Sequence, residues 1–593
     1  MRAFVLLLFW CEGLAAAQAA AQSVSLEQLE TAVVRAEDVR AIKKLQRAYG
    51  YYADRGLWDD LADLFTDDAT ANYPSGGFDG NASIRAMFVQ NLGQGKTGLA
   101  EGRVYNHTIL QPVVDLAPEG ATATGRWRVL GMLGRYGGTA TWADSLYRFD
   151  YVKRDGRWKI HALTAYAGSG GGYEQGWIRP KPRPPGAVDT SPVRFNLAHP
   201  ADRPWIDPCE ADVSVCVVPF PYANRGTRVP APLATVSIAT ERGSPAADLV
   251  QRAQRLADEQ AVTNLQHAYE YDLSRGRWRD AAARFAPDGA REEGQAGVYV
   301  GRERIRRALA LAGPEGLADG QRNDHLAFEP IVDVAADGRS AKGRFFELAF
   351  TGGGGRPLRL IQNVHENEYV RRGDRWWIRS MHVYTLLVSD YAQGWAKSAL
   401  PLPSPSSELP PDRAPSVVYE PHPKTFLPPL HFTNPASASN VVATQGDVDA
   451  RRIAQALKQA ERAGDYDEIE NLQNAFGYYA EKALWSEIAP LFVKRPTLGS
   501  GQPEGPAPGM LNSQLQLQPV IDIAADGRTA SLQSRLLRLA RDANGRPVWG
   551  GGRYVAKLAS TGGVWRFVRL ELEDGYEFDY RAGWSVSAAG PPN

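Results

Sequence analysis

Cysteine, charge imbalance and long apolar runs are what this 593-residue sequence lacks: it has three cysteines, and its 67 basic residues equal its 67 acidic ones. Balanced charge argues against a nucleic acid or an anionic membrane as partner, because both need a basic face. Beyond the N-terminus, no stretch is apolar for long enough to span a bilayer. The sequence also has no HExxH motif, cysteine cluster or closely spaced histidine pair, so we expect no metal ion.

The N-terminus has the pattern of an export signal. Arg2 supplies a positive charge, residues 3–10 are apolar, and residues 15–21 are small and contain A-x-A cleavage sites. We therefore predict a signal peptide over 1–21 and a periplasmic or secreted protein, with a buried first helix as the alternative. In an oxidising compartment Cys209 and Cys216 can close a small loop, although two unpaired thiols fit the spacing equally.

One sequence block occurs three times, and each occurrence is followed by a closing Tyr-x-x-Gly-Trp motif. The blocks lie at residues 45–58, 265–278 and 472–485, and the closing motifs at 173–177, 391–395 and 580–584. This spacing is that of whole domains and not of solenoid repeats. We expect domain 1 over 23–177, domain 2 over 244–395 and domain 3 over 448–587, with proline-rich connectors over 178–243 and 396–447. Because the connectors carry aromatic residues at matched places, we expect each to lie on a neighbouring domain.

Within each domain, helical periodicity comes first and strand alternation follows. Leu45, Ala48, Tyr49 and Tyr52 recur at helical spacing, and Gly56 is expected to end this helix. The remaining segments alternate as strands joined by hairpins. This order predicts an α+β fold, in which a curved antiparallel sheet wraps over helices and leaves a conical cavity suited to a small molecule.

Two local features refine this expectation. The glycine-rich runs 168–172 and 352–355 are predicted to be turns, because neither lies between a strand and a helix as a phosphate-binding loop does. In domain 3, proline and glycine between Phe492 and Met510 replace a helix expected at 83–91 in domain 1. The pocket of domain 3, if it has one, is therefore expected to have different walls.

Several short motifs of domains 1 and 2 recur together. They are the Phe-x-x-Asp-Gly/Ala turns at 65–69 and 285–289, the strand starts Asn106-His107 and Asp324-His325, and an Asp-Gly-Arg-Trp hairpin. In these residues the sequence resembles the SnoaL-like branch of the nuclear transport factor 2-like superfamily, which includes scytalone dehydratase, bile-acid dehydratase and ketosteroid isomerase. The resemblance covers domains 1 and 2 throughout and domain 3 in part.

The resemblance implies a cofactor-free site in which a Tyr and an Asp of the first helix face a His across the cavity. In this sequence these residues are Tyr49, Asp54 and His107. Because several members of the family are homotrimers, the three domains are expected to form an intramolecular pseudo-trimer. Further residues expected to line the cavities of domains 1 and 2 are Tyr52, Trp58, Trp127, Tyr147, Tyr269, His325 and His365.

The residues themselves are consistent with acid–base chemistry. A buried Asp–His pair can act as a base, and a Tyr can stabilise an oxyanion. Asp54 follows Tyr49 by about 140° around an ideal helix, so both reach one cavity only if the cavity is wide or the helix end unwinds. The structural alternatives are a core Tyr49, a pairing of Asp54 with Arg55, and an edge histidine at His107.

Domain 1 carries the complete trio, whereas the other domains do not. Domain 2 has Ser274 in place of Asp54, and domain 3 has Phe476, Glu481 and Gln514 in place of the three residues. The sequence therefore predicts a cofactor-independent lyase or isomerase with its site in domain 1, which dehydrates, eliminates an aldehyde from, or shifts a double bond in a hydrophobic cyclic or aromatic small molecule. The alternative is a non-catalytic exported binding or scaffold protein.

Overall fold

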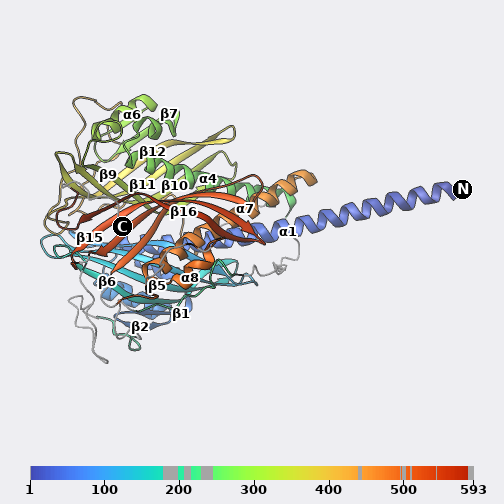
Figure 1. Ribbon diagram of the computed structural model, residues 1–593, viewed down its shortest axis with the longest axis horizontal. Coiled ribbons are helices and arrows are strands. Elements are labelled where there is room, and N and C mark those ends of the chain that lie inside the picture. The colour runs from blue at the N-terminus through green and yellow to red at the C-terminus, as the bar shows by residue number, and fades with distance from the viewer. Residues whose placement is uncertain are drawn as a thin grey trace.

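The computed structural model describes residues 2–177, 198–205, 216–228, 245–437, 444–494, 496, 503–507, 511–542 and 544–584, with side chains from Leu26 onward. Three α+β units follow one another along the chain, and each consists of a leading helix and a curved, mainly antiparallel sheet (Figure 1). The predicted fold class is confirmed.

Domain 1 begins with one long helix and ends with four long strands. Its elements are α1 (Arg2–Arg55), α2 (Trp58–Asp63), β1 (Phe65–Tyr73), β2 (Gly76–Asp79), α3 (Asn81–Ala86), η1 (Met87–Leu92), β3 (Arg103–Leu116), β4 (Thr122–Arg135), β5 (Ala140–Arg154) and β6 (Arg157–Gly172). The sheet has the order β2-β1-β6-β5-β4-β3, and only the β1–β6 pair is parallel. The C-terminal part of α1 packs on this sheet and forms one core with it.

Domain 2 repeats this arrangement closely. Its elements are α4 (Ala246–Ser274), α5 (Trp278–Ala283), β7 (Phe285–Glu293), β8 (Val298–Val300), α6 (Arg302–Leu309), η2 (Ala310–Ala312), β9 (Gln321–Val334), β10 (Ser340–Gly353), β11 (Arg356–Arg372) and β12 (Arg375–Asp390). The sheet order, β8-β7-β12-β11-β10-β9, matches that of domain 1 strand for strand.

Domain 3 is shorter. It comprises α7 (Ala450–Glu481), α8 (Trp485–Ile488), η3 (Ala489–Leu491), β13 (Asn512–Ile523), β14 (Thr529–Arg541), β15 (Pro547–Thr561) and β16 (Val564–Asp579). Its sheet has four strands, and its described residues include no counterpart of β1, β2 or α3. A single bridge between Phe492 and Phe567 remains where β1 pairs with β6 in domain 1. The helix predicted to be missing is thus absent from the part of domain 3 that the structure describes.

Each leading helix is followed by a residue whose backbone has a positive φ angle, in the left-handed region. Gly56 has φ +67° after α1, and Gly276 has φ +63° after α4. A Cβ atom on Gly56 would lie 2.6 Å from the carbonyl carbon of Gly98, so glycine also permits close packing there. Domain 3 places Ala483 at this position with φ +49°, a conformation that is less favourable for a residue with a side chain.

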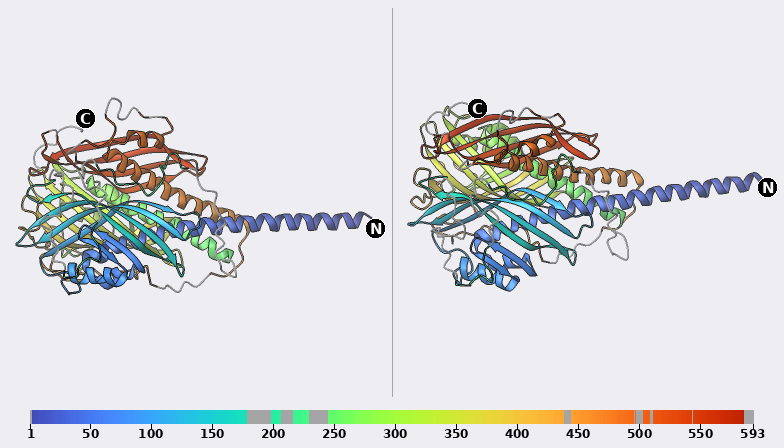
Figure 2. Two further views of the ribbon diagram at one scale, coloured as in Figure 1. Left: turned by 90° about the horizontal axis from the view of Figure 1, so that it is seen from below. Right: turned by 60° about the horizontal axis from the view of Figure 1, so that its bottom comes forward.

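The three domains pack against one another, and both views of Figure 2 show their leading helices α1, α4 and α7 side by side along one axis of the molecule. At one end of the axis, α1, α4 and α7 form a three-helix bundle with a core of small and aliphatic side chains, among them Leu29, Leu249 and Ile453. Near this bundle, the buried Lys43 of α1 forms ion pairs with Asp467 (2.6 Å) and Glu470 (2.5 Å) of α7. The expected intramolecular pseudo-trimer therefore describes the packing of this chain.

At the other end of the axis, the three closing motifs form a cyclic hydrogen-bond network. The Tyr173 hydroxyl donates to the carbonyl oxygen of Tyr391 at 2.5 Å. Tyr391 donates in the same way to Tyr580 (2.6 Å), and Tyr580 donates to Tyr173 (2.6 Å). Buried tryptophans of all three domains surround this tyrosine ring, including Trp177 and Trp395. Each domain thus satisfies a buried carbonyl group of the next domain.

A second cyclic set of contacts comes from β-bulges in the first long strand of each sheet. Gln111, Glu329 and Gln518 have positive φ angles of 56°, 52° and 49°, and each precedes a proline. Gln111 of domain 1 donates to Asn474 O of domain 3 at 3.1 Å, and Glu329 of domain 2 accepts from Ile109 N of domain 1 at 2.7 Å. Gln518 of domain 3 completes the cycle by donating to His325 O of domain 2 at 3.3 Å.

Residues of the repeated block make the matching contacts from the helix side. Arg47 donates to Pro330 O at 2.6 Å, and Asn474 donates to Pro112 O at 2.7 Å. In domain 2, Nδ1 of the equivalent His267 lies 2.8 Å from Pro519 O. The repetition of this block therefore reflects an interface that all three domains share, besides any site.

The described parts of both connectors lie on neighbouring domains, as predicted. Asn224 of the first connector donates to Glu487 O of domain 3 at 2.8 Å, and Asn434 of the second donates to Asp60 O of domain 1 at 3.0 Å. Cys216 is disulfide-bonded, so it is not a free thiol, whereas Cys209 lies outside the described residues.

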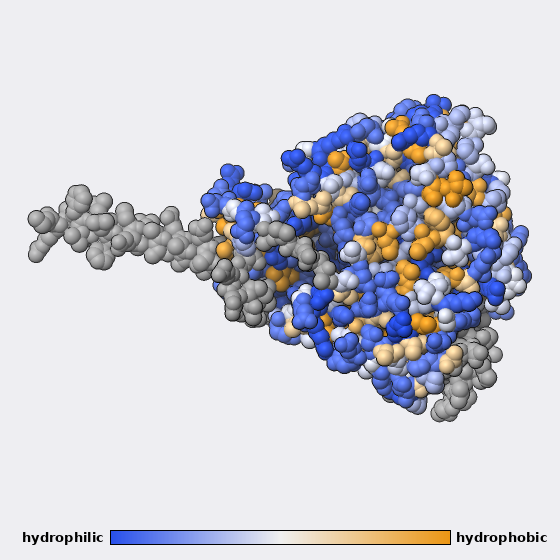
Figure 3. Space-filling model, turned by 180° about the vertical axis from the view of Figure 1, so that it is seen from behind, coloured by the Kyte–Doolittle hydropathy of each residue, from blue (hydrophilic) through white to orange (hydrophobic). Residues whose placement is uncertain are grey.

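On the face shown in Figure 3, hydrophobic and hydrophilic residues are interspersed.

The prediction of a turn at 168–172 is wrong. These glycines belong to β6, and a Cβ atom on Gly168 would lie 1.7 Å from the carbonyl oxygen of Asp144 on β5. Glycine is needed there because the two strands approach closely beside the aromatic core. The run at 352–355 does form a turn between β10 and β11, at Gly354 and Gly355.

The predicted signal peptide falls on the part of α1 that projects from the body of the molecule in Figure 1. Side chains of this segment lie outside the described residues, so the leader stays a prediction. Across the described part of the chain, no helix combines the length and apolarity that crossing a membrane requires.

We predict that Tyr580→Phe destabilises the protein about twice as much as Tyr173→Phe. The Tyr173 hydroxyl serves one carbonyl group, whereas that of Tyr580 also accepts from Trp142 Nε1 at 2.8 Å. Each buried partner left unsatisfied costs about 1–3 kcal/mol. Urea unfolding of the full chain measures the difference. The exposed Tyr136→Phe serves as control, and equal losses in the two ring variants would contradict the prediction.

Candidate functional site

The core of domain 1 contains a group of buried phenols between α1 and the sheet. The hydroxyl oxygens of Tyr49 and Tyr73 lie 2.9 Å apart. Burial raises the pKa of both, as it does for Tyr105 and Tyr147, and Tyr147 raises the pKa of the other three further. The four groups therefore stay protonated at neutral pH and can donate hydrogen bonds to a guest oxygen.

Asp54 lies in the last turn of α1 and faces the start of β3. Its Oδ1 accepts from the backbone N–H of His107 at 2.5 Å, and its Oδ2 accepts from Asn106 Nδ2 at 3.2 Å. The His107 ring nitrogen Nδ1 lies 3.8 Å from Asp54 Oδ1 and has no hydrogen-bond partner among the described residues. Asp54 is only 3% exposed, so the structure brings this carboxyl and this imidazole together inside the protein.

Burial shifts the two groups in opposite directions. It raises the pKa of Asp54 to about 7, although Arg55 and the two N–H donors act the other way. Burial, with a contribution from Arg103, lowers the pKa of His107 to about 4. At neutral pH the imidazole is therefore neutral, and Asp54 is the group of the pair that can both take up and release a proton.

Within the part of the chain that the structure describes, Tyr49 makes no hydrogen bond to this pair. Its ring packs edge-on against Phe65 and Phe149, with ring centroids 6.2 and 5.6 Å away. Tyr105 lies between Tyr49 and the Asp54–His107 pair. Its ring centroid is 4.3 Å from that of His107, and the charge of Asp54 raises its pKa. The predicted trio thus splits into an Asp54–His107 pair and a phenol group that contains Tyr49.

Three further residues that the sequence assigned to the cavity wall are fully buried with internal partners. Trp58 Nε1 donates to Lys96 O at 2.9 Å, and Trp127 Nε1 donates to the Tyr151 hydroxyl at 3.0 Å. Tyr52 packs near the connector residue Phe432, with ring centroids 6.4 Å apart. Their contribution to ligand binding stays a prediction.

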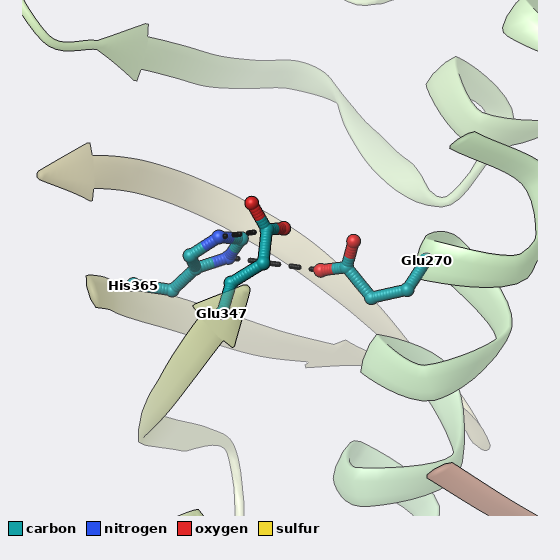
Figure 4. Close-up of side chains that lie close together, drawn as sticks. All are labelled: Glu270, Glu347 and His365. Atoms are coloured by element: carbon teal, nitrogen blue, oxygen red, sulfur yellow. Dashed lines mark ion pairs between the residues drawn. The ribbon is translucent and has the colours of Figure 1, made fainter. Parts of the chain in front are cut away.

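Domain 2 places a different set of polar groups in the equivalent space. Glu347 on β10 lies between two imidazoles, with its Oε2 3.2 Å from His325 Nδ1 and 3.2 Å from His365 Nε2. Glu270 on α4 approaches from the other side, with its Oε1 3.7 Å from His365 Nδ1 (Figure 4). The Tyr269 hydroxyl, 3.2 Å from Arg291 Nε, is also in this domain core.

The two carboxyl groups of domain 2 titrate differently. Burial, together with the neighbouring Glu347, holds the pKa of Glu270 well above its ordinary range. For Glu347 burial is outweighed by His325 and His365, which hold its pKa well below the ordinary range. Perturbed carboxyl groups of this kind, side by side in one core, are typical of functional sites.

Sequence reasoning named His325 and His365 but missed Glu270 and Glu347. Glu270 occupies the place in the repeated block where domains 1 and 3 have Gly50 and Gly477, and that difference was a usable signal. Glu347 gave a weaker one, because its equivalence to other strand positions depends on the sheet register.

Domain 3 fills its core with structural contacts. Phe476 packs edge-on against Tyr554 with ring centroids 5.6 Å apart, and Glu481 pairs with Arg128 of domain 1. Gln514 lies on β13 at the place of His107. These contacts occupy the core of domain 3, and its purely structural role stays a prediction.

Comparison with known sequences identifies the family. The sequence model of the SnoaL-like domain matches residues 34–164, 254–382 and 503–571, which is more than half of the chain. No curated protein is similar to this chain at a significant level.

Three solved structures are similar to parts of this chain. A scytalone dehydratase-like protein of Novosphingobium aromaticivorans is 17% identical over 26% of this chain and 96% of its own length, with a TM-score of 0.21. A nuclear transport factor 2-like protein with a cystatin-like fold from the same organism is 22% identical over 22% and 82%, with a TM-score of 0.20. A hexachlorocyclohexane dehydrochlorinase is 20% identical over 23% and 90%, with a TM-score of 0.20.

We predict that Asp54 makes stability pH-dependent. Its pKa rises from 3.8 to about 7 on folding, so the stability from its protonated form is complete below pH 3.8 and is lost as the pH approaches about 7. The free energy of unfolding of the wild type relative to Asp54→Asn should therefore fall across this window, as urea unfolding at several pH values would show.

The exposed Asp68 of β1 provides the control. Its hydrogen bonds to Thr66 and Arg154 lower its pKa to about 2, so Asp68→Asn should give a constant difference above pH 3.8. A constant difference for Asp54→Asn as well would contradict the assignment of a neutral-range pKa to Asp54.

Proposed function

This chain belongs to the SnoaL-like domain family, and from that premise we propose that domain 1 is a cofactor-independent acid–base lyase or isomerase for a hydrophobic cyclic or aromatic small molecule. Elimination of water or of a small aldehyde, or a double-bond shift, is the reaction class. Export through the leader at 1–21 and a periplasmic or secreted location belong to the same proposal. The family supports a small-molecule-binding or catalytic role, and the choice of reaction rests on the site.

One observation carries the proposal: Asp54 is a buried carboxyl with a pKa of about 7 beside a neutral imidazole. A general acid–base works best when its pKa lies near the working pH, because both protonation states are then available. An ordinary carboxylate, with a pKa near 4, is a much weaker base at neutral pH.

The groups of domain 1 can be assigned to the steps of a dehydration. The Asp54 carboxylate removes the proton from the carbon next to a carbonyl group, and the C–H electron pair forms an enolate. A phenol of the Tyr49 group donates a hydrogen bond to the enolate oxygen. The enolate then re-forms the carbonyl and a C=C bond as the β-hydroxyl leaves, and Asp54 returns its proton so that water departs. The neutral His107 ring borders this path.

A specific observation also supports the non-catalytic alternative. In domain 2, the Ser274 hydroxyl accepts from the backbone N–H of His325 at 3.0 Å, which is the bond that Asp54 makes to His107. The position therefore connects the helix end to the strand start whether or not it carries a carboxyl group. A binding or scaffold protein needs only this connection.

The same observation supplies a matched test. We predict that Asp54→Ser, which installs the domain 2 residue and keeps its hydrogen bond, lowers kcat/KM by at least about 100-fold, the usual contribution of general acid–base catalysis. Conversion of 3-hydroxy-1-tetralone to 1-naphthol reports dehydration, and conjugation of 3-cyclohexen-1-one reports isomerisation. The wild-type rate should rise with pH through about 7 as Asp54 ionises.

Ser274→Ala in domain 2 is the control and should leave the rate unchanged. Full activity of Asp54→Ser would show that the carboxyl only connects helix and strand. If the wild type is no faster than buffer on either compound but its tryptophan fluorescence responds to 1-naphthol, the binding function replaces the catalytic one.

A further inference from the structure

The core of domain 2 gathers oxygen and nitrogen atoms in the geometry of a cation site. One ligand atom from each of Glu270, Glu347 and His365 can be chosen so that all three lie within 4.8 Å of one another. Glu347 Oε2 lies 3.2 Å from His365 Nε2, and Glu270 Oε1 lies 3.7 Å from the other ring nitrogen, Nδ1 (Figure 4). Atoms that share one Zn²⁺ ion at bond lengths of about 2 Å lie about 3–4 Å apart, so the spacing between Glu347 Oε2 and His365 Nε2 fits one ion.

Atoms facing this point lack the hydrogen bonds that buried polar groups normally make. Glu270, Glu347 and His365 are 0%, 1% and 1% exposed. Neither ring nitrogen of His365 has a hydrogen-bond partner in the described part of the chain, nor do Oε2 of Glu270 and Oε2 of Glu347. Burying such groups without partners is costly, and a bound cation would give a partner to one ring nitrogen of His365 and to the carboxylate oxygens that face it.

The other oxygen of each carboxylate is held in place by an amide. Asn363 Nδ2 donates to Glu347 Oε1 at 2.5 Å, and Gln266 Nε2 donates to Glu270 Oε1 at 2.7 Å. Each carboxylate thus has one oxygen fixed by the protein and one oxygen left for a ligand. Amide donors behind ligating carboxylates are the arrangement that orients ligands in metal sites.

The cluster is specific to domain 2. The strand registers place Val129 and Leu536 where domain 2 has Glu347, both of them buried. In the same registers His365 corresponds to Tyr147 and Tyr554, and Glu270 corresponds to the two glycines of the repeated block. Domains 1 and 3 thus fold with none of these ionisable groups in their cores, whereas domain 2 has all three.

We propose that Glu270, Glu347 and His365 bind a divalent transition-metal ion of the Zn²⁺ class, with His325 beside Glu347 as a further nitrogen ligand. Mixed imidazole and carboxylate ligands favour Zn²⁺ and its first-row neighbours, whereas Mg²⁺ and Ca²⁺ prefer oxygen alone. The charges are compatible, because two carboxylates balance one divalent cation. The nearby Arg291 is already paired with Glu293 at 2.6 Å. The site is independent of the chemistry proposed for domain 1.

Metal retention by the untagged full-length protein tests the proposal. The protein is stripped with a chelator, dialysed against Zn²⁺ and then against buffer, and its metal content is measured. We expect one Zn²⁺ per chain for the wild type, and visible absorption bands when Co²⁺ is used instead. The proposal would be overturned if the stripped wild-type protein, once reloaded, retained neither Zn²⁺ nor Co²⁺. It would also be overturned if Mg²⁺ at equal concentration displaced Zn²⁺.

The other two domains supply the test variants. Glu347→Val, Glu270→Gly and His365→Tyr each install a residue that the fold already accommodates, and each should abolish stoichiometric retention. Asn363→Ser, which introduces the equivalent Ser145 of domain 1, should weaken Zn²⁺ binding about 10- to 100-fold through the orientation of Glu347. The half-exposed His161→Ala is the control and should retain one Zn²⁺. Equal retention by all variants would mean surface binding only and would refute the site, with circular dichroism confirming that each variant folds.

Discussion

The cyclic hydrogen-bond ring of Tyr173, Tyr391 and Tyr580 is the constraint on which the rest of this structure depends. Each hydroxyl satisfies a buried carbonyl group of the next domain, so no domain can complete its own core alone. A buried carbonyl group without a hydrogen-bond partner costs about 1–3 kcal/mol of folding free energy. The ring therefore stabilises the fold fully only when all three domains are packed together. The three-helix bundle at the opposite end of the axis imposes the same requirement through apolar packing. Fusion of the three domains in one chain ensures that each always has its neighbours.

This closure also builds the candidate site of domain 1. Glu329 reaches from domain 2 to the backbone of Ile109, and Gly50 leaves room for it, because a Cβ atom there would lie 2.5 Å from the Glu329 carboxylate. Burial raises the pKa of Glu329, and the nearby charge of Asp54 raises it further. Assembly of the domains thus brings a second buried carboxyl group, that of Glu329, close to Asp54.

The three domains share one fold and differ at a few positions whose side chains face the core. Domain 1 combines phenols with a single carboxyl, domain 2 combines two carboxylates with two imidazoles, and domain 3 closes its core with an aromatic contact and the Glu481–Arg128 pair. The position of Gly50, Glu270 and Gly477 shows how small the change is: the glycines admit a side chain from the neighbouring domain, whereas the glutamate points into its own core. The three domains repeat the residues that contact one another at the interfaces, but they differ in the polar side chains of their cores.

The sequence alone was sufficient for the fold class, the three repeats and the end of the first leading helix at Gly56, because helical and strand periodicities and the repeated block are local signals. The family resemblance pointed to Asp54 and His107, and the match between the repeats pointed to His325 and His365. It did not reveal that Glu347 lies between two imidazoles, because strand register decides which side chains meet and register is a tertiary property. The glycines at 168–172 were mistaken for a turn for the same reason: the close approach of β5 becomes visible only when the sheet is assembled. Local pattern determined the elements, and only their packing decided which polar groups share a buried space.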